Sequence, residues 1–296
     1  MTTPSPKSKS QTHAFHDHNR SWETFEYVYP VVSRRSRGLS IGINLNPDTI
    51  CNFDCVYCQV EKRPAPRPVR VDTQRLRSEL DTLLGQVKSG EIWKHPRFAG
   101  VGRGLRVIRD IAFSGDGEPT SAGCFGEAVQ IAVELKQAYQ LDRVRLIVIT
   151  NATLLDRPAV EQALSVLDQH QGEVWAKLDA GTEAYYKQVD RSHVPFDRIL
   201  NNLLVCGRRR PIVIQTMVMR LHGEPMPNSE FNAYQDRLGE LIRRGCRVRK
   251  VQLYTVARRP LESYVSPVND DTLERMANQL RQRLPELEVE WFGSGG

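Results

Sequence analysis

Apolar residues follow two different patterns, and segments of the two patterns alternate along the chain. Short apolar stretches that read as strands fall at 39–45, 110–114, 144–149, 173–179, 212–219 and 250–255, with another at 287–291. Between them, apolar residues recur every three or four positions over 76–87, 124–135, 160–167, 199–205, 231–242 and 273–284. Strands that alternate with helices predict an α/β protein with a parallel sheet. The periodicity fits both an open doubly wound sheet and an incomplete barrel.

The composition is that of a globular chain. With 296 residues, of which 40% are hydrophobic and 26% charged, it can bury a sizeable core. We expect a disordered polar tail over 1–20, one core domain over 21–292 and a flexible end over 293–296. No apolar run reaches 18 residues, which predicts no membrane span. The start of the chain lacks a signal-peptide apolar region, and six cysteines suit a reducing cytoplasm.

Three cysteines stand close together where the first predicted strand ends. Cys51, Cys55 and Cys58 have the spacing Cys-x3-Cys-x2-Cys, which lets one loop bring three sulfurs to one centre. A structural zinc site requires four ligands. Three thiolates suit a [4Fe–4S] cluster with one iron left open. From the spacing alone, a zinc-binding or redox-labile knuckle completed by a distant ligand is the alternative.

A second motif follows the second predicted strand. It reads Gly115-Asp116-Gly117-Glu118-Pro119. Glycines let a backbone approach a ligand closely, Glu118 adds a carboxylate, and Pro119 fixes the exit toward the next helix. An acidic glycine-rich turn is the ordinary alternative. The carboxyl ends of parallel strands are where barrel enzymes place their chemistry, and both motifs occupy such ends.

Together the two motifs resemble those of the radical S-adenosylmethionine (SAM) superfamily. The resemblance implies a partial (β/α)6 TIM-like barrel and a [4Fe–4S] cluster on Cys51, Cys55 and Cys58. The open iron would chelate SAM, which an electron from a flavodoxin- or ferredoxin-type donor would cleave to a 5′-deoxyadenosyl radical. The stretch 115–119 resembles the family's Gly-Gly-Glu-Pro-like segment, which meets the SAM amino group. It is a one-residue variant of that pattern.

The resemblance also implies further cofactor contacts. Polar residues at the ends of the third and fourth strands would hold the SAM ribose and carboxylate: Thr150, Asn151, Lys177 and Asp179. Tyr57, next to a cluster ligand, would reach the adenine. Because Lys177 and Asp179 lie on the same side of their strand, a salt-linked pair is an equal alternative. Candidates for substrate or adenine contacts are Gln215, Thr216 and Tyr254.

Within the superfamily, the stretch 174–191 resembles the wyosine-base (tRNA imidazoguanine) synthetases. No cysteine precedes Cys51, where the archaeal enzymes of that group carry a second cluster, and the flavodoxin-like domain of the eukaryotic enzymes is absent. The scattered Cys124, Cys206 and Cys246 suit small buried apolar residues better than an auxiliary cluster. We therefore expect a wyosine-synthetase-like radical SAM oxidoreductase with an unassigned substrate.

The charge pattern bears on that substrate. The formal net charge is +6, and residues 243–259 contain seven basic residues and no acidic one. Arg34, Arg35, Arg37 and the run 208–210 add further cations. Arginine clusters bind phosphate, so tRNA is a candidate partner. Ordinary surface charge is the alternative. A peptide or protein substrate, as for glycyl-radical activases, and a non-catalytic Fe–S or zinc redox protein are rival functions.

Overall fold

This computed structural model describes residues 22–33, 35–61 and 69–294. The strands within these ranges form one curled sheet. The strand order along the sheet is β1-β2-β3-β4-β5-β6-β8-β10. These strands are β1 (Val28–Ser33), β2 (Gly38–Ile43), β3 (Ile108–Phe113), β4 (Arg145–Thr150), β5 (Gly172–Lys177), β6 (Ile212–Leu221), β8 (Val248–Thr255) and β10 (Glu288–Phe292). From β2 to β10 every neighbouring pair is parallel. Since β1 and β10 end this order, the described sheet forms a partial barrel.

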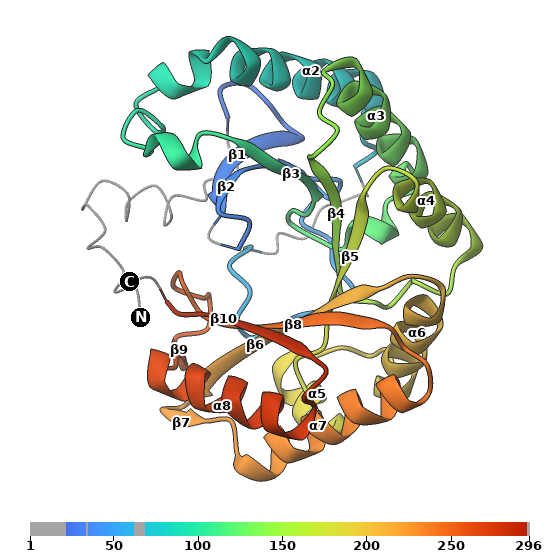
Figure 1. Cartoon of the computed structure of the whole chain (residues 1–296), viewed down its shortest axis with the longest axis vertical. Helices are drawn as coiled ribbons and strands as arrows, with labels where there is room; N and C mark the ends of the chain where they lie inside the picture. Colours follow the sequence, from blue (N-terminus) through green and yellow to red (C-terminus); the bar gives the residue numbers. More distant parts are fainter. Residues whose placement is uncertain (1–21, 34, 62–68, 295–296) are drawn as a thin grey trace.

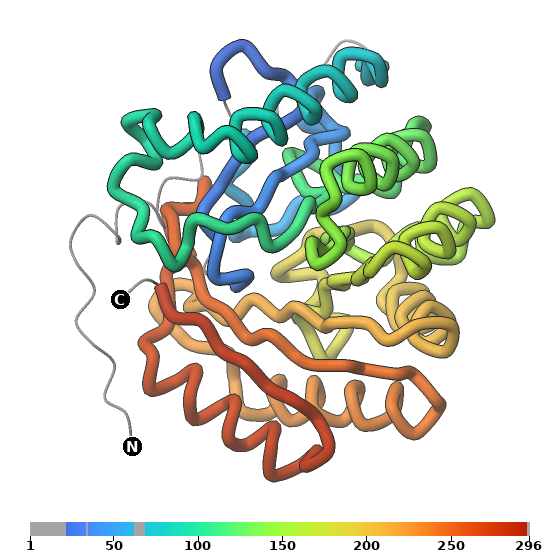
Figure 2. Tube along the Cα trace, turned by 45° about the horizontal axis from the view of Figure 1, so that its top comes forward, coloured from blue at the N-terminus to red at the C-terminus, as the bar shows by residue number. Residues whose placement is uncertain are grey.

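Helices cover the convex face of the sheet (Figure 1). They are α2 (Thr73–Ser89), α3 (Phe125–Ala138), α4 (Pro158–Asp168), α5 (Glu183–Val189), α6 (Phe196–Arg209), α7 (Asn228–Arg243) and α8 (Asp270–Arg283), with 3-10 turns at Glu91–Lys94, Arg103–Leu105 and Pro119–Ser121. Figure 2 shows how the chain alternates between inner strand and outer helix. In the described part of the chain, no helix is long and apolar enough to cross a bilayer.

The six predicted strands, the closing strand and the six predicted helices are all present. The ends of the predicted strands differ from the observed ones by no more than three residues, which is usual because local signals place ends poorly. The predicted tail over 1–20 and the last two residues of the predicted flexible end lie outside the described residues. The division into tail, core and end therefore stays a prediction.

Strand β1 was not predicted as a strand. It pairs with β2 in an antiparallel hairpin, with Pro30 opposite Ile41. Five of its six residues are buried, so it lacks the alternation by which half-buried strands are recognised. Pro30 can be accommodated because β1 is the edge strand of the described sheet. The short helix α5 and the two short strands β7 (Glu224–Pro225) and β9 (Val265–Pro267), which pair with β6, were also missed.

Because the strands from β2 to β10 are parallel, their carboxyl ends lie at one end of the barrel. The cysteine loop follows β2, and the Gly115–Pro119 stretch follows β3. Thr150 ends β4, and Lys177 ends β5. The topology therefore gathers the two sequence motifs and the predicted polar strand ends at one mouth.

Candidate active site

The cysteine loop is held at the barrel mouth by the last residue of α5 and by the segment that follows this helix. The amide of Asp54 donates to the Asp190 carbonyl at 3.0 Å, and the amide of Val56 donates to the Val189 carbonyl at 2.8 Å. Val56 is buried, with 2% of its surface exposed. These contacts keep the backbone of the loop in place and leave all three of its cysteines only partly buried.

All three cysteines line one cavity of about 320 Å³. Other residues that line it are Tyr57, Gly115, Asp116, Gly117, Met217, Tyr254 and Arg258. A volume of about 300 to 1,000 Å³ is usual for small-molecule sites. The cavity therefore brings together the thiols, the predicted adenine contact and the glycine-rich stretch.

Three thiolates are a donor set that an iron–sulfur cluster with one open iron would use. Within the described ranges, no three His, Cys, Asp or Glu side chains are grouped closely enough to hold one ion. Cys51, Cys55 and Cys58 would hold such a cluster and leave its fourth iron open to the cavity.

The surroundings of the Cys55 thiol favour its neutral form. Burial raises the pKa of the Cys55 thiol well above its ordinary value, and the Asp190 carboxyl raises it further. The Cys55 sulfur lies 3.4 Å from Asp190 Oδ1. A thiolate, not a thiol, is the metal ligand. A bound cluster would itself supply the compensating charge.

Gly115 and Gly117 allow a close approach of two protein segments. A Cβ atom on Gly115 would lie 2.2 Å from Asn44 Oδ1, and one on Gly117 would lie 2.2 Å from the Ile50 carbonyl oxygen. The sequence attributed these glycines to the approach of a ligand. In the structure their lack of a side chain also lets the stretch after β3 pack against the segment that leads into the cysteine loop. Asp116 joins this contact, because it accepts from Asn44 Nδ2 at 2.6 Å.

The Glu118 carboxylate faces the protein interior. Its Oε1 accepts from the Thr120 hydroxyl at 2.5 Å and the Thr150 hydroxyl at 2.7 Å, and its Oε2 accepts from the Asn151 amide at 2.7 Å. Burial raises the pKa of Glu118, and these donors oppose the rise. The predicted contact to the SAM amino group stays untested, and Glu118, Thr150 and the neighbouring Pro119 are buried.

Asn151 connects this buried network to the cysteine loop. Its Nδ2 donates to Asn52 Oδ1 at 2.6 Å and lies 3.9 Å from the Cys51 sulfur. Its Oδ1 accepts from the Thr153 hydroxyl at 2.7 Å. Through Asn151, the second motif and the end of β4 are therefore hydrogen-bonded to the cysteine loop.

Lys177 and Asp179 form the salt-linked pair that the sequence left open. Lys177 Nζ lies 3.1 Å from Asp179 Oδ2 and is placed between the rings of Tyr57 and Tyr254, 4.7 and 4.8 Å from their centroids. Tyr57 donates to Asp179 Oδ2 at 2.5 Å, and the Met217 amide donates to Oδ1 at 2.6 Å. Burial alone would lower the pKa of Lys177, but Asp179 and Tyr254 raise it above its ordinary value.

Asp190 and Arg191 are site residues to which the sequence assigned no role. Burial raises the pKa of Asp190 well above its ordinary value, and Asp179 adds to the rise. Arg191 bridges Asp54 of the cysteine loop at 3.2 Å and also pairs with Glu262. Asp190 and Arg191 are the last two residues of the stretch that resembles the wyosine-base synthetases. That resemblance was the one feature of the sequence that pointed to them.

The remaining candidates separate into cavity and core. Tyr254 lines the cysteine cavity, and Gln215 lines a second cavity beside it. Thr216 is buried and donates to the Leu178 carbonyl at 2.9 Å, so it serves the framework. Cys206 and Cys246 are buried, as expected of small apolar residues.

The basic run 243–259 is divided by the fold. Its first five members lie around the amino end of β8, at the opposite end of the strand from the cysteine loop. Three of these five pair with carboxylates: Arg244 with Glu240 at 3.2 Å, Arg249 with Glu173 at 2.9 Å and Lys250 with Glu290 at 3.1 Å. Arg258 follows β8 and lines the cysteine cavity. The tRNA prediction stays untested, but most of its charges lie away from the site.

No known protein-family model matches the sequence. The chain is 23% identical over 252 residues to the GTPase Obg of Brachyspira hyodysenteriae, covering 83% of this chain but only 32% of that protein. It contains no Gly-x4-Gly-Lys-Ser/Thr phosphate-binding sequence. It is also similar to UPF0026 proteins of Methanocaldococcus jannaschii (24% identical, 89% of this chain and 74% of that protein) and Synechocystis (26% identical, 73% and 71%).

Two solved structures share the fold. TYW1 with a lysine-pyruvate adduct bound superposes with a TM-score of 0.54 at 15% identity, over 83% of this chain and 74% of that one. Streptococcus suis SuiB bound to S-adenosylmethionine gives 0.58 at 12% identity, over 88% and 52%. The chain therefore has the partial-barrel fold of the radical SAM enzymes. The radical SAM recognition made from the two motifs is confirmed at the level of fold, and TYW1, a wyosine synthetase of the kind that the stretch 174–191 resembles, shares that fold.

Proposed function

We propose that this protein is a radical SAM enzyme that holds a [4Fe–4S] cluster on Cys51, Cys55 and Cys58. One observation supports the proposal above the others: the three thiols and the Gly115–Gly117 stretch line the same cavity at the carboxyl ends of the barrel strands. When bound there, the reduced cluster and SAM would supply a 5′-deoxyadenosyl radical that removes hydrogen from a substrate.

The protein's own groups would position SAM and shield it. Gly115, Asp116, Gly117 and Tyr57 all line the cavity, so they would be in reach of SAM bound there. The half-buried Lys177 lies between Tyr57 and Tyr254 and holds the two rings together. An electron donor of flavodoxin or ferredoxin type would reduce the cluster. A cytoplasmic location would give the thiols the reducing conditions they need.

The proposal is tested by anaerobic reconstitution with iron and sulfide. After reduction with dithionite and addition of SAM, we expect 5′-deoxyadenosine by mass spectrometry. Cys55→Ala should abolish it and lower the iron content. Cys124→Ala is the matched control, because Cys124 is partly buried but lines a different hollow, and this variant should keep the activity.

Two outcomes contradict the proposal. A colourless protein that retains zinc points to the zinc-binding alternative. A stable cluster without SAM cleavage points to a non-catalytic iron–sulfur protein.

A further inference from the structure

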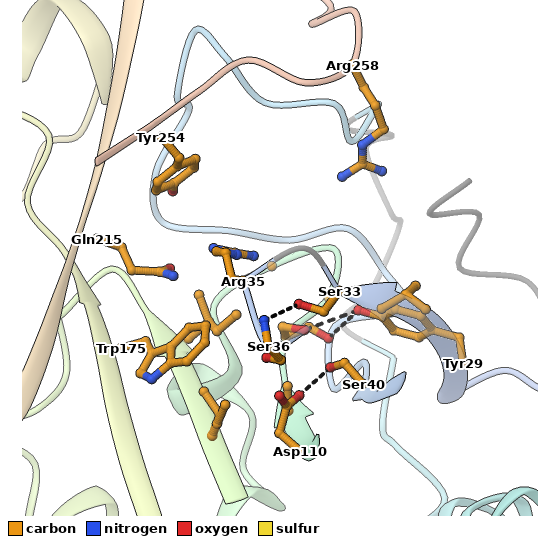
Figure 3. Close-up of a pocket in the computed structure, with 17 residues that line it drawn as sticks. Tyr29, Ser33, Arg35, Ser36, Ser40, Asp110, Trp175, Gln215, Tyr254 and Arg258 are labelled. Carbon is orange, nitrogen blue, oxygen red and sulfur yellow. Dashed lines mark hydrogen bonds between the residues drawn. The ribbon is translucent and has the colours of Figure 1, made fainter. Parts of the chain in front are cut away.

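A second cavity of about 250 Å³ opens beside the cysteine cavity, within the curl of the sheet (Figure 3). The two cavities adjoin each other, since both are lined by Ser33, Arg35, Gly115, Gly117, Tyr254 and Arg258. The second cavity contains none of the cysteines. It is therefore a separate compartment, and it adjoins the predicted cofactor site at the 115–117 stretch.

Gln215, which lines this cavity, has a hydrogen-bond acceptor with no partner in the described part of the chain. Glu290 Oε2 accepts from Gln252 Nε2 at 3.0 Å, which fixes the orientation of the Gln252 amide, since an ionised carboxylate only accepts. Gln252 Oε1 in turn accepts from Gln215 Nε2 at 3.0 Å. This leaves Gln215 Oε1 buried and without a partner. A buried carbonyl oxygen of this kind favours a ligand that carries an N–H group.

Arg35 supplies a cation in the middle of the same cavity, beside Gln215 (Figure 3). Its guanidinium lies 5.6 Å from the Trp175 ring centre and 5.3 Å from that of Tyr254. It forms no ion pair with any described residue. The aromatic rings hold the guanidinium in place, and its donor edge suits a planar carboxylate.

The rest of the wall limits the ligand's charge and size. Asp110 lines the cavity, bonded to Ser40 and 3.5 Å from Arg145. Asp110 would repel an anionic ligand, and a phosphate dianion more strongly than a carboxylate, because the repulsion grows with the charge of the ligand. Trp175 is already covered by Arg35 and, at 5.8 Å, by Arg145, so its face is not free to stack on a nucleobase.

We propose that the cavity between Arg35 and Gln215 is the substrate pocket, and that it binds an amino-acid-sized carboxylate bearing an amide or amine N–H. The carboxylate pairs with Arg35, and the N–H donates to Gln215 Oε1. The assignment of this pocket to the substrate depends on the proposed radical SAM function. The assignment of the pocket as a ligand-binding site does not, because neither Arg35 nor Gln215 touches the cysteines.

The test is ligand-observed NMR on the full chain without iron or SAM. N-acetylglycine is the probe, because it carries one carboxylate and one N–H. N-acetylglycinamide lacks the negative charge, and N-acetylsarcosine replaces the N–H by N–CH₃. We expect each analogue to bind about tenfold more weakly than N-acetylglycine. Arg35→Gln and Gln215→Met should weaken N-acetylglycine binding to the same extent. Arg37→Gln, an exposed position in the same hairpin, should not.

The proposal is overturned if N-acetylglycine does not bind, if both analogues bind equally well, or if inorganic phosphate competes at equal concentration. The analogues decide the question on the unaltered protein even where a variant fails to fold. Binding without 5′-deoxyadenosine formation would keep this pocket and refute the radical function. The reverse result would refute the pocket alone.

Discussion

The Glu118 carboxylate shows that a residue of a cofactor-like motif can serve the framework. Its two oxygens accept bonds from Thr120, Thr150 and Asn151, and it is 2% exposed. Asn151 passes this connection on to Asn52 and the Cys51 sulfur. The side chain therefore links the strand ends of β3 and β4 to the cysteine loop.

We predict that Glu118→Gln destabilises the fold by about 1 to 3 kcal/mol at neutral pH, because an amide cannot accept from every donor around it. Burial raises the pKa of Glu118 above its ordinary value of 4.5, so the native state binds the proton more tightly than the unfolded chain. The advantage of the natural protein over the variant should therefore increase as the pH falls from neutral toward 4.5. Urea unfolding at several pH values measures it.

The exposed Glu127→Gln serves as the control and should change little. A difference between the natural protein and Glu118→Gln that shrinks as the pH falls would contradict the prediction.

At the scale of elements, the segment after α5 acts as a brace for the cysteine loop. Two backbone bonds join 54 and 56 to 190 and 189, at 3.0 and 2.8 Å. Arg191 adds ion pairs to Asp54 on the loop and to Glu262 in the segment after β8. Its guanidinium group keeps its positive charge at any working pH. The brace joins three parts of the chain that are distant in sequence.

Loss of Arg191 should loosen this brace without unfolding the barrel. For Arg191→Ala we expect the amides of Asp54 and Val56 to exchange roughly fivefold faster, corresponding to about 1 kcal/mol of lost local stability. Hydrogen exchange followed by mass spectrometry checks this directly in the protein before iron is added.

Arg198→Ala is the matched control, since Arg198 pairs with Asp156 on the outer surface at 3.1 Å. Equal exchange in the two variants would show that Arg191 does not hold the loop.

At the scale of the whole molecule, ion pairs tie strands together at the barrel end opposite the cysteine loop. Glu173 on β5 receives Arg249 of β8 at 2.9 Å, Arg145 of β4 at 3.4 Å and the Trp175 indole N–H at 2.9 Å. The candidate active site and the cross-strand charge pairing therefore occupy opposite ends of the barrel, as active site and stabilising contacts usually do in barrel enzymes.

Replacement of Glu173 by Ala should cost about 2 kcal/mol, because two arginines and a buried indole N–H lose their common acceptor. Glu183→Ala, which removes an exposed pair with Lys187, should cost no more than about 0.5 kcal/mol. Chemical denaturation compares the two. Similar costs would mean that the Glu173 cluster does not stabilise the barrel.

The sequence by itself determined the α/β order, the parallel sheet and the cysteine spacing. These depend on local periodicity and on short-range spacing, which are visible in one dimension. It also placed both motifs at strand ends, so their meeting at one mouth followed from parallel topology alone.

Only the tertiary structure decided which polar groups face the cavity. It turned Glu118 inward, paired Lys177 with Asp179, and brought Arg35 from an unpredicted hairpin beside Gln215. It also moved most of the basic run away from the mouth. Side-chain direction and long-range pairing depend on contacts between residues that are far apart in sequence, and a single sequence carries no local signal for such contacts.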